Sequence, residues 1–222
     1  MSRARRAGQV SQTRGRGGRS LDSSRDLVLR EAALAVLAEV GYDRLTMDAV
    51  AARARAAKTT IYRRWPGKAE LVVDALNSLK GVPEVPDTGS LRRDLRALAE
   101  SITSAEGRFG AQVTIGMVNA LARDGELRRV FGEKFIAPRM AAFRTVFERA
   151  VARGEMPGGH DLDLLARLFP ALGLQQVVSS GELPGTRLAC QIMDEVVYPL
   201  ATAPPARPYP AGDATAGGKP HA

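Results

Sequence analysis

Two short helix-forming segments, residues 47–54 and 57–65, are separated by a break of only two residues. The hydroxyl of Thr46 can accept an amide hydrogen at the start of the first segment, and Pro66 and Gly67 end the second. A break this short makes the two helices cross and pack against each other. Because the second helix carries threonine and arginine side chains away from its apolar side, the pair has the sequence form of a helix-turn-helix.

Positive charge is concentrated around this pair and at the N-terminus. The formal net charge of the 222-residue chain is +8. Residues 1–20 hold six arginines and no acid, and residues 44–68 hold seven cations against the single acid Asp48. The rest of the chain is therefore mildly acidic. This split is expected of a polyanion-binding module attached to a body that does not bind the polyanion.

Helical periodicity continues on both sides of the pair. Leu29, Ala33 and Leu37 recur along one face of a helix that Ser23 or Ser24 can cap and that Gly41 can end. Residues 68–76 resume the helical pattern directly after Gly67, so a helix joins the helix-turn-helix to the body. After a turn-rich linker, Ser90 and Asp94 can open the next helix. Five further helices are predicted at about 91–104, 110–123, 126–153, 161–179 and 186–200. The chain has no alternating pattern typical of strands, so the predicted fold class is all-α.

Several classes of protein are excluded by what the sequence lacks. No apolar run approaches the roughly 18 residues of a membrane span, and no secretory signal is recognisable, so we expect a cytoplasmic protein without a membrane partner. Cys190 is the only cysteine, which excludes an intrachain disulfide and a cysteine-based zinc cluster. The two histidines, His160 and His221, belong to no recognisable catalytic or metal-binding set. We therefore expect no enzyme, no metal and no cofactor.

Three runs carry a family resemblance: Gly41-Tyr42-Asp43, Thr46-Met47-Asp48-Ala49-Val50-Ala51, and the run from Lys58 to Leu71 with its Pro66-Gly67-Lys68 sequence. Over residues 27–76 the chain resembles the N-terminal part of TetR-type (tetracycline-repressor family) transcriptional regulators. The resemblance implies a homodimer that binds a double-stranded DNA operator and responds to an unknown small-molecule effector. Beyond this part the likeness is one of helix number and order only.

Four parts of the chain are predicted, the two outer ones from their composition and the two inner ones with the help of the resemblance. These are a disordered basic arm (1–20), a three-helix helix-turn-helix DNA-binding domain (21–67), a helical ligand-binding and dimerisation domain (68–202) and a disordered tail (203–222). The arm is either a solubilising tail or an enhancer of DNA binding.

Apart from Arg55, the predicted DNA-binding residues are those that the resemblance implies, and they lie on the two short helices and at the start of the helix that follows them. Thr46 would bond a backbone phosphate, and Lys68 with the amides of its helix would clamp another. Arginine can chelate guanine and a threonine methyl can touch thymine, which suits the second helix to the major groove. The full predicted set is Thr46, Arg55, Lys58, Thr59, Thr60, Tyr62, Arg63, Arg64 and Lys68.

The chain departs from the family pattern at two positions. Arg55 stands where the turn usually has glycine, and Ala57 replaces the usual capping serine. Because a non-glycine residue at positive φ is uncommon, the turn can differ or carry modest strain. Arg55 can instead add a phosphate contact.

Two further sets of residues are assigned to the body. Aromatic and methionine side chains suit an adaptable apolar pocket, although each residue taken singly is as well explained by an ordinary core. The predicted pocket residues are Phe109, Met117, Phe131, Phe135, Met140, Phe143 and Phe147. The last two helices would form the dimer interface through Leu165, Leu168, Leu172, Leu188, Ile192 and Val196, the alternative being internal packing.

The leading hypothesis is a ligand-responsive repressor of a palindromic operator. An activator of the same fold shares every DNA-facing residue. A sequence-indifferent architectural protein that relies on the arginine-rich arm is the second class of hypothesis, and its affinity should scarcely depend on DNA sequence.

Overall fold

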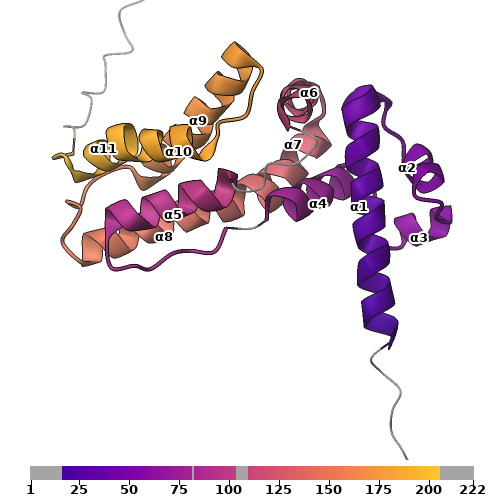
Figure 1. Cartoon of the computed structure of the whole chain (residues 1–222), viewed down its shortest axis with the longest axis horizontal. Coiled ribbons are helices and arrows are strands. Elements are labelled where there is room, and N and C mark those ends of the chain that lie inside the picture. Colours follow the sequence, from indigo (N-terminus) through magenta and orange to yellow (C-terminus); the bar gives the residue numbers. More distant parts are fainter. Residues whose placement is uncertain (1–16, 82, 104–109, 206–222) are drawn as a thin grey trace, which may run out of the picture. The chain divides into compact units, whose positions relative to one another are not determined.

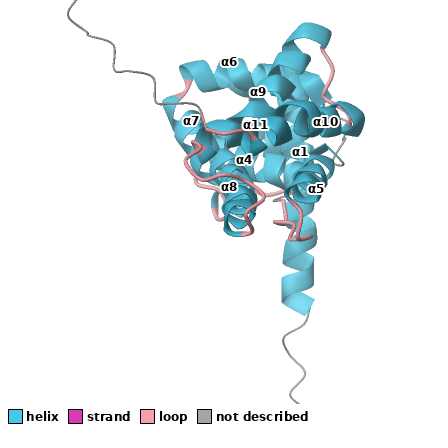
Figure 2. Ribbon diagram, turned by 90° about the vertical axis from the view of Figure 1, so that its left-hand side faces the viewer, coloured by secondary structure: helices cyan, strands magenta, loops and turns pink. Residues whose placement is uncertain are grey.

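The computed structural model describes residues 17–81, 83–103 and 110–205. Every regular element in these ranges is a helix (Figures 1 and 2), which confirms the predicted all-α fold class. The elements are α1 (Gly17–Arg44), α2 (Met47–Arg53), α3 (Lys58–Tyr62), α4 (Lys68–Lys80), α5 (Leu91–Thr103), α6 (Gly110–Arg123), α7 (Gly125–Phe131), the π-helical η1 (Gly132–Ile136), α8 (Ala137–Ala152), α9 (Leu162–Ser180), α10 (Thr186–Ile192), the π-helical η2 (Met193–Val197) and α11 (Tyr198–Thr202). None of these helices is long and apolar enough to cross a membrane.

These elements form two compact units. The first consists of α1–α4 with α6, α7 and η1, and the second of α5, α8, α9, α10, η2 and α11. The units are divided differently from the functional domains predicted from the sequence, which place the boundary at residue 67. The helix α4 buries Leu71, Val72 and Val73 and packs on α1, while α7 packs on α4. Because α4 packs on two helices of the first unit, it belongs structurally with the helix-turn-helix.

The core of the first unit is built on the apolar face of α1. Leu29, Ala33 and Leu37 are buried there, in the periodic positions that predicted the helix. Val50 of α2 and Ile61 of α3 are completely buried in the same cluster. These two side chains fix the short helices, which are too brief to be stable alone.

The bounds of α1 differ from the prediction at its N-terminal end. The helix begins at Gly17 and not at Ser23 or Ser24, so the last four residues of the predicted arm are helical. A capping residue permits a start without forcing one, and residues 17–23 contain no proline to prevent a helix. The remaining arm residues, 1–16, lie outside the described residues, as does the tail beyond Pro205. Gly41, the predicted end, has φ 74° and kinks the helix before its last turn.

In the second unit, α5 packs against α8 and α10. Leu91, Leu95 and Leu98 of α5 share one core with Phe143 and Phe147 of α8.

Two long helical stretches match the predicted helices at 126–153 and 186–200, except that each contains a π-helical turn, η1 or η2. Asp161 caps α9 by accepting a hydrogen bond from the Leu164 amide at 3.0 Å, and Gly181 ends this helix in the left-handed conformation.

Candidate nucleic-acid interface

Thr46 begins the helix-turn-helix as the N-cap of α2. Its Oγ1 accepts a hydrogen bond from the Ala49 amide at 3.1 Å, as the sequence predicts. The side chain is exposed. Because a hydroxyl that accepts one hydrogen bond still has its own hydrogen to donate, Thr46 can cap the helix and bond a phosphate oxygen at the same time.

The turn between α2 and α3 places Arg55 in the left-handed region, with φ 51°. The Ala56 amide donates to the Ala51 carbonyl at 2.9 Å, and the Arg55 amide donates to the Ala52 carbonyl at 3.2 Å. This pair of bonds is the Schellman motif, in which glycine is the usual residue at the left-handed position. The turn therefore has the geometry of a glycine turn with an arginine in it.

Arg55→Gly should raise the stability of the protein. A non-glycine residue with positive φ is strained, and glycine relieves that strain at some cost in chain entropy, so we expect a net gain of about 0.5–1 kcal/mol. Thermal unfolding followed by circular dichroism measures it. Ala52→Gly is the matched control: Ala52 lies inside α2 at an exposed position, and glycine there should cost about 1 kcal/mol. Equal destabilisation by both changes would contradict the left-handed conformation of Arg55.

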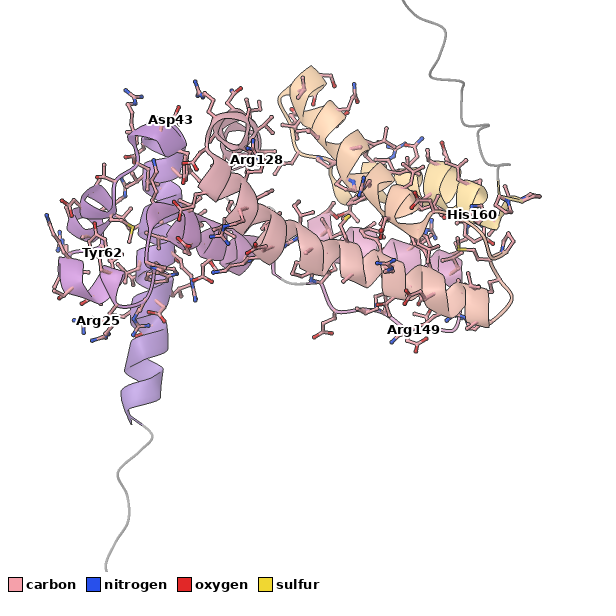
Figure 3. The ribbon with its side chains drawn as sticks, turned by 180° about the vertical axis from the view of Figure 1, so that it is seen from behind. Arg25, Asp43, Tyr62, Arg128, Arg149 and His160 are labelled. Carbon is pink, nitrogen blue, oxygen red and sulfur yellow. The ribbon has the colours of Figure 1, made fainter. Side chains whose placement is uncertain are left out.

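The helix α3 presents a polar edge and is anchored by one apolar side chain. Ile61 is buried completely, while Lys58, Thr59 and Tyr62 are exposed and Thr60 is half-buried. Tyr62 has half of its surface accessible, with its phenol at the outer edge of the unit (Figure 3). As expected from Ala57, no side chain caps the start of α3.

Of four exposed cations in and beside α2 and α3, two have acidic partners and two do not. Lys58 Nζ lies 2.6 Å from Asp48 Oδ2, and this hydrogen-bonded pair raises the pKa of Lys58. Arg53 pairs with Glu39 at 2.7 Å. Arg55 and Arg63 are exposed and form no ion pair with any residue in the described ranges. Arg63 is therefore the cation next to α3 whose charge is most available to DNA.

Arg64 is held against α1. Its guanidinium forms an ion pair with Asp26, and both side chains are largely buried. Such a pair ties the end of α3 to α1, across 38 residues of sequence. Nothing in the local sequence indicated Asp26 as a partner. The contact favours a positioning role for Arg64, although its predicted contact with DNA is not tested by this geometry.

A second connection holds the end of the motif to α4. The Trp65 indole Nε1 donates to Asp74 Oδ2 at 2.9 Å, and Arg30 Nε of α1 donates to the same oxygen at 2.8 Å. Trp65 itself is buried. Asp74 therefore joins α1, α4 and Trp65 in one hydrogen-bonded group. This group holds the C-terminal end of α3 in place against α1 and α4.

Lys68 at the start of α4 faces the end of α1. Its Nζ lies 4.3 Å from the centre of the Tyr42 ring and donates to the Tyr42 carbonyl at 3.3 Å. Burial, and next the Asp124 carboxylate, raise the pKa of the Tyr42 phenol. These contacts give Lys68 a structural partner within the unit. Its predicted phosphate contact remains a prediction.

The predicted pocket residues fall into both compact units. In the first unit Met117 is buried, and the rings of Phe131 and Phe135 stack with their centres 4.7 Å apart. In the second unit Phe143 and Phe147 are buried in the core and Met140 packs against it. Phe109 lies outside the described residues. The two groups lie in different units. A single pocket lined by both groups therefore remains a prediction.

The predicted dimer residues are less exposed than some of their neighbours on α9. Leu165 and Ile192 are buried in the core of the second unit. Half-buried positions are occupied by Leu168, Leu172, Leu188 and Val196. Three apolar side chains of α9 that point away from the core are Leu164, Leu174 and Val178, which are 58%, 37% and 71% exposed. They share one helical face, because they follow one another at intervals of ten and four residues.

Comparisons with known proteins agree with this geometry. A family described as "Bacterial regulatory proteins, tetR family" matches residues 29–75, and one described as "Tetracyclin repressor-like, C-terminal domain" matches residues 85–196. An uncharacterized HTH-type transcriptional regulator of Mycobacterium tuberculosis is 36% identical over 181 residues, which are 81% of this chain and 89% of that protein. A DNA-binding transcriptional repressor TetR of Mycobacteroides abscessus is 34% identical over 179 residues, 80% of this chain and 94% of that protein.

Solved structures show the same fold at lower identity. GusR of Salmonella enterica has a TM-score of 0.63 and 18% identity, covering 81% of this chain and 96% of that one. The fatty acid degradation regulator FadR of Bacillus halodurans has a TM-score of 0.60 and 18% identity, covering 75% and 96%.

Proposed function

The chain belongs to the tetR family of DNA-binding transcriptional regulators, and we propose that it is an effector-responsive repressor that binds a palindromic operator as a homodimer. The observation that carries the proposal is the exposed polar edge at α3. Thr59, Tyr62 and Arg63 are exposed along it, while Ile61 anchors the helix from the other side. An edge of this kind fits the major groove of a duplex, where arginine and threonine can reach the edges of bases.

Each residue of this edge has a distinct role in the proposal. Arg63 donates to a guanine, and Thr59 contacts a base or its methyl group. Tyr62 and Thr46 bond phosphate oxygens through their hydroxyls, which sets the register of the helix without reading sequence. Arg64 and Trp65, through Asp26 and Asp74, hold the helix at its docking angle.

The exposed apolar face of α9 supports the homodimer. Leu164, Leu174 and Val178 would leave a stripe of apolar surface in water on a single chain. A two-fold copy covers such a stripe with the same stripe from its partner. The operator then has two half-sites about 34–36 Å apart, one turn of DNA, related by the same two-fold axis.

Response to an effector rests on the predicted apolar pocket. A ligand acts only if it binds one spacing of the two helix-turn-helix motifs better than the other. A coupling free energy of about 1–3 kcal/mol changes operator affinity about 5- to 150-fold. One similar solved structure is named "Flavonoid-responsive Regulator FrrA", a property stated of that protein alone.

Selection of bound fragments from genomic DNA with the purified protein tests the proposal. A palindromic consensus with a specificity ratio of about 10³ or more supports it. Bound fragments that share no consensus sequence would instead support the alternative, an architectural protein that binds DNA of any sequence. A reporter under the selected operator separates the remaining alternatives, because deletion of the gene raises expression for a repressor and lowers it for an activator.

Arg63→Ala should weaken operator binding at least about 30-fold, because a dimer loses one base contact in each half-site and each is worth about 1–3 kcal/mol. Gel-shift titration of operator and scrambled duplexes measures the change, and the loss should be larger on the operator. Arg129→Ala is the control, since Arg129 is an exposed arginine of α7 that pairs with Glu133 at 2.9 Å. Unchanged operator affinity in the Arg63 variant would remove this residue from the interface.

A further inference from the structure

Arg25 of α1 lies one helical turn before the apolar face that builds the first core. Leu29, four residues later on the same side of the helix, is 1% exposed. Arg25 is exposed, because the core ends between these two positions. The helix α1 thus carries a long cationic side chain just beyond the last layer of apolar residues.

The adjacent residue fixes where this side chain lies. Asp26 holds the Arg64 guanidinium at the end of α3, so the turn of α1 that contains Arg25 is clamped to the recognition helix. Figure 3 shows Arg25 and Tyr62 at the same outer edge of the unit. Arg128 of α7 lies on the other side of α1 in this view.

The charge of Arg25 is available. Nearby cations are engaged by acids: Arg30 with Asp74 at 2.8 Å and Arg64 with Asp26. Within the part of the chain that the structure describes, Arg25 forms no ion pair or hydrogen bond. It shares this property and its exposure with Arg63, and an arginine at such a position can donate to a phosphate without first breaking a protein contact.

We propose that Arg25 is a DNA-backbone contact contributed by α1, outside the helix-turn-helix, on the strand that borders the groove occupied by α3. A helix that precedes the recognition helix and is packed on its end approaches the backbone at the edge of the groove. Phosphates are identical along the duplex, so this contact strengthens binding without selecting sequence. The inference rests on the proposed docking of α3, to which it adds an independent anchor.

The test compares Arg25→Ala, Arg25→Lys and Arg128→Ala by fluorescence anisotropy, with operator and scrambled duplexes between 50 and 300 mM KCl. Each lost phosphate contact should make the slope of log affinity against log salt concentration shallower by about 0.9, so a dimer that loses one contact in each subunit should change it by about 1.8. We expect this change for Arg25→Ala on both duplexes, with an unchanged ratio between them. Arg25→Lys should keep the slope, because it keeps the charge. Arg128→Ala should also keep it.

Thermal unfolding of each variant shows whether the change acts on folding, and we expect equal midpoints because Arg25 is exposed and forms no hydrogen bond or ion pair with the described residues. An unaltered slope for Arg25→Ala, while the unaltered chain prefers its operator, would overturn the inference and leave the proposed function intact. If the unaltered chain shows no preferred operator, the proposed function fails. The slopes measured on scrambled duplex then still decide whether Arg25 meets phosphate.

Discussion

A protein in which Leu174 and Val178 are both replaced by glutamate should be a monomer at concentrations where the unaltered chain is a dimer. Burying two such side chains contributes about 1.5–3 kcal/mol each, and a two-fold interface contains every position twice. In addition, each introduced glutamate would lie near the same glutamate of the partner subunit, and the two negative charges would repel each other. Sedimentation or light scattering gives the mass, and we expect that of a single chain.

The same variant should bind operator about 10²–10⁴-fold more weakly. In a dimer, the second helix-turn-helix binds its half-site as an intramolecular step at a high effective concentration, and a monomer loses this step. A duplex that contains one half-site should be bound equally by the variant and by the unaltered chain, since each monomer keeps its own α3. This comparison separates loss of the dimer from damage to the DNA-binding unit.

Val85→Glu is the matched control, because Val85 is an exposed valine outside α9. It should remain a dimer with normal affinity for the full operator. A double variant of α9 that stays dimeric would show that this face is not the interface. The half-buried predicted residues Leu168, Leu172, Leu188 and Val196 would then be tested next.

The helices of this fold were predictable because their signals are local. Gly41 kinks α1 before its last turn and Gly181 ends α9, both at positive φ, and Thr46 and Asp161 cap α2 and α9. Periodic burial of apolar residues likewise depends only on spacing along one helix. A polar edge on α3, opposite Ile61, could therefore be identified from about ten residues of sequence.

Contacts between distant residues were not predictable. Asp26 meets Arg64 across 38 residues, and Asp74 receives Arg30 across 44, so no spacing rule connects them. Acidic residues on an amphipathic helix are usually solvated. These two gain a structural role only in the folded chain, where α1 packs on α4 and Asp26 pairs with the arginine that follows α3. The sequence predicted these cations as one set, but it could not show which of them already had partners.

The sequence also did not show which apolar residues of α9 belong to the core and which belong to the proposed interface. Leu165 and Val178 are both apolar residues of α9, yet one is buried within the chain and the other is largely exposed. A helix with apolar residues on two faces gives no sign of which face the chain itself covers. That distinction depends on α8, α10 and η2, which pack against α9 and share a core with Leu165.

Asp94 is the most deeply buried acid among the described residues, with no exposed surface. Its Oδ1 accepts hydrogen bonds from the amide and the hydroxyl of Thr88, both at 2.7 Å, and its Oδ2 lies 3.3 Å from Arg153 Nη2. Glu155 accepts a hydrogen bond from the Leu91 amide at 2.7 Å and pairs with Arg153. Together these groups join the first turn of α5 to the end of α8.

Asp94→Ala should lower the free energy of unfolding by about 3 kcal/mol. The change leaves the Thr88 amide without its acceptor, removes one acidic partner of Arg153 and empties a packed site. Urea unfolding followed by circular dichroism should show a midpoint lower by about 1–3 M, given the usual slope of about 1–3 kcal/mol/M. Glu148→Ala is the control, because this exposed carboxylate of α8 pairs with Arg144 at 3.4 Å and should contribute less than about 1 kcal/mol. Equal midpoints for the two variants would mean that Asp94 is hydrated in solution, and that α5 is held to α8 by its leucines alone.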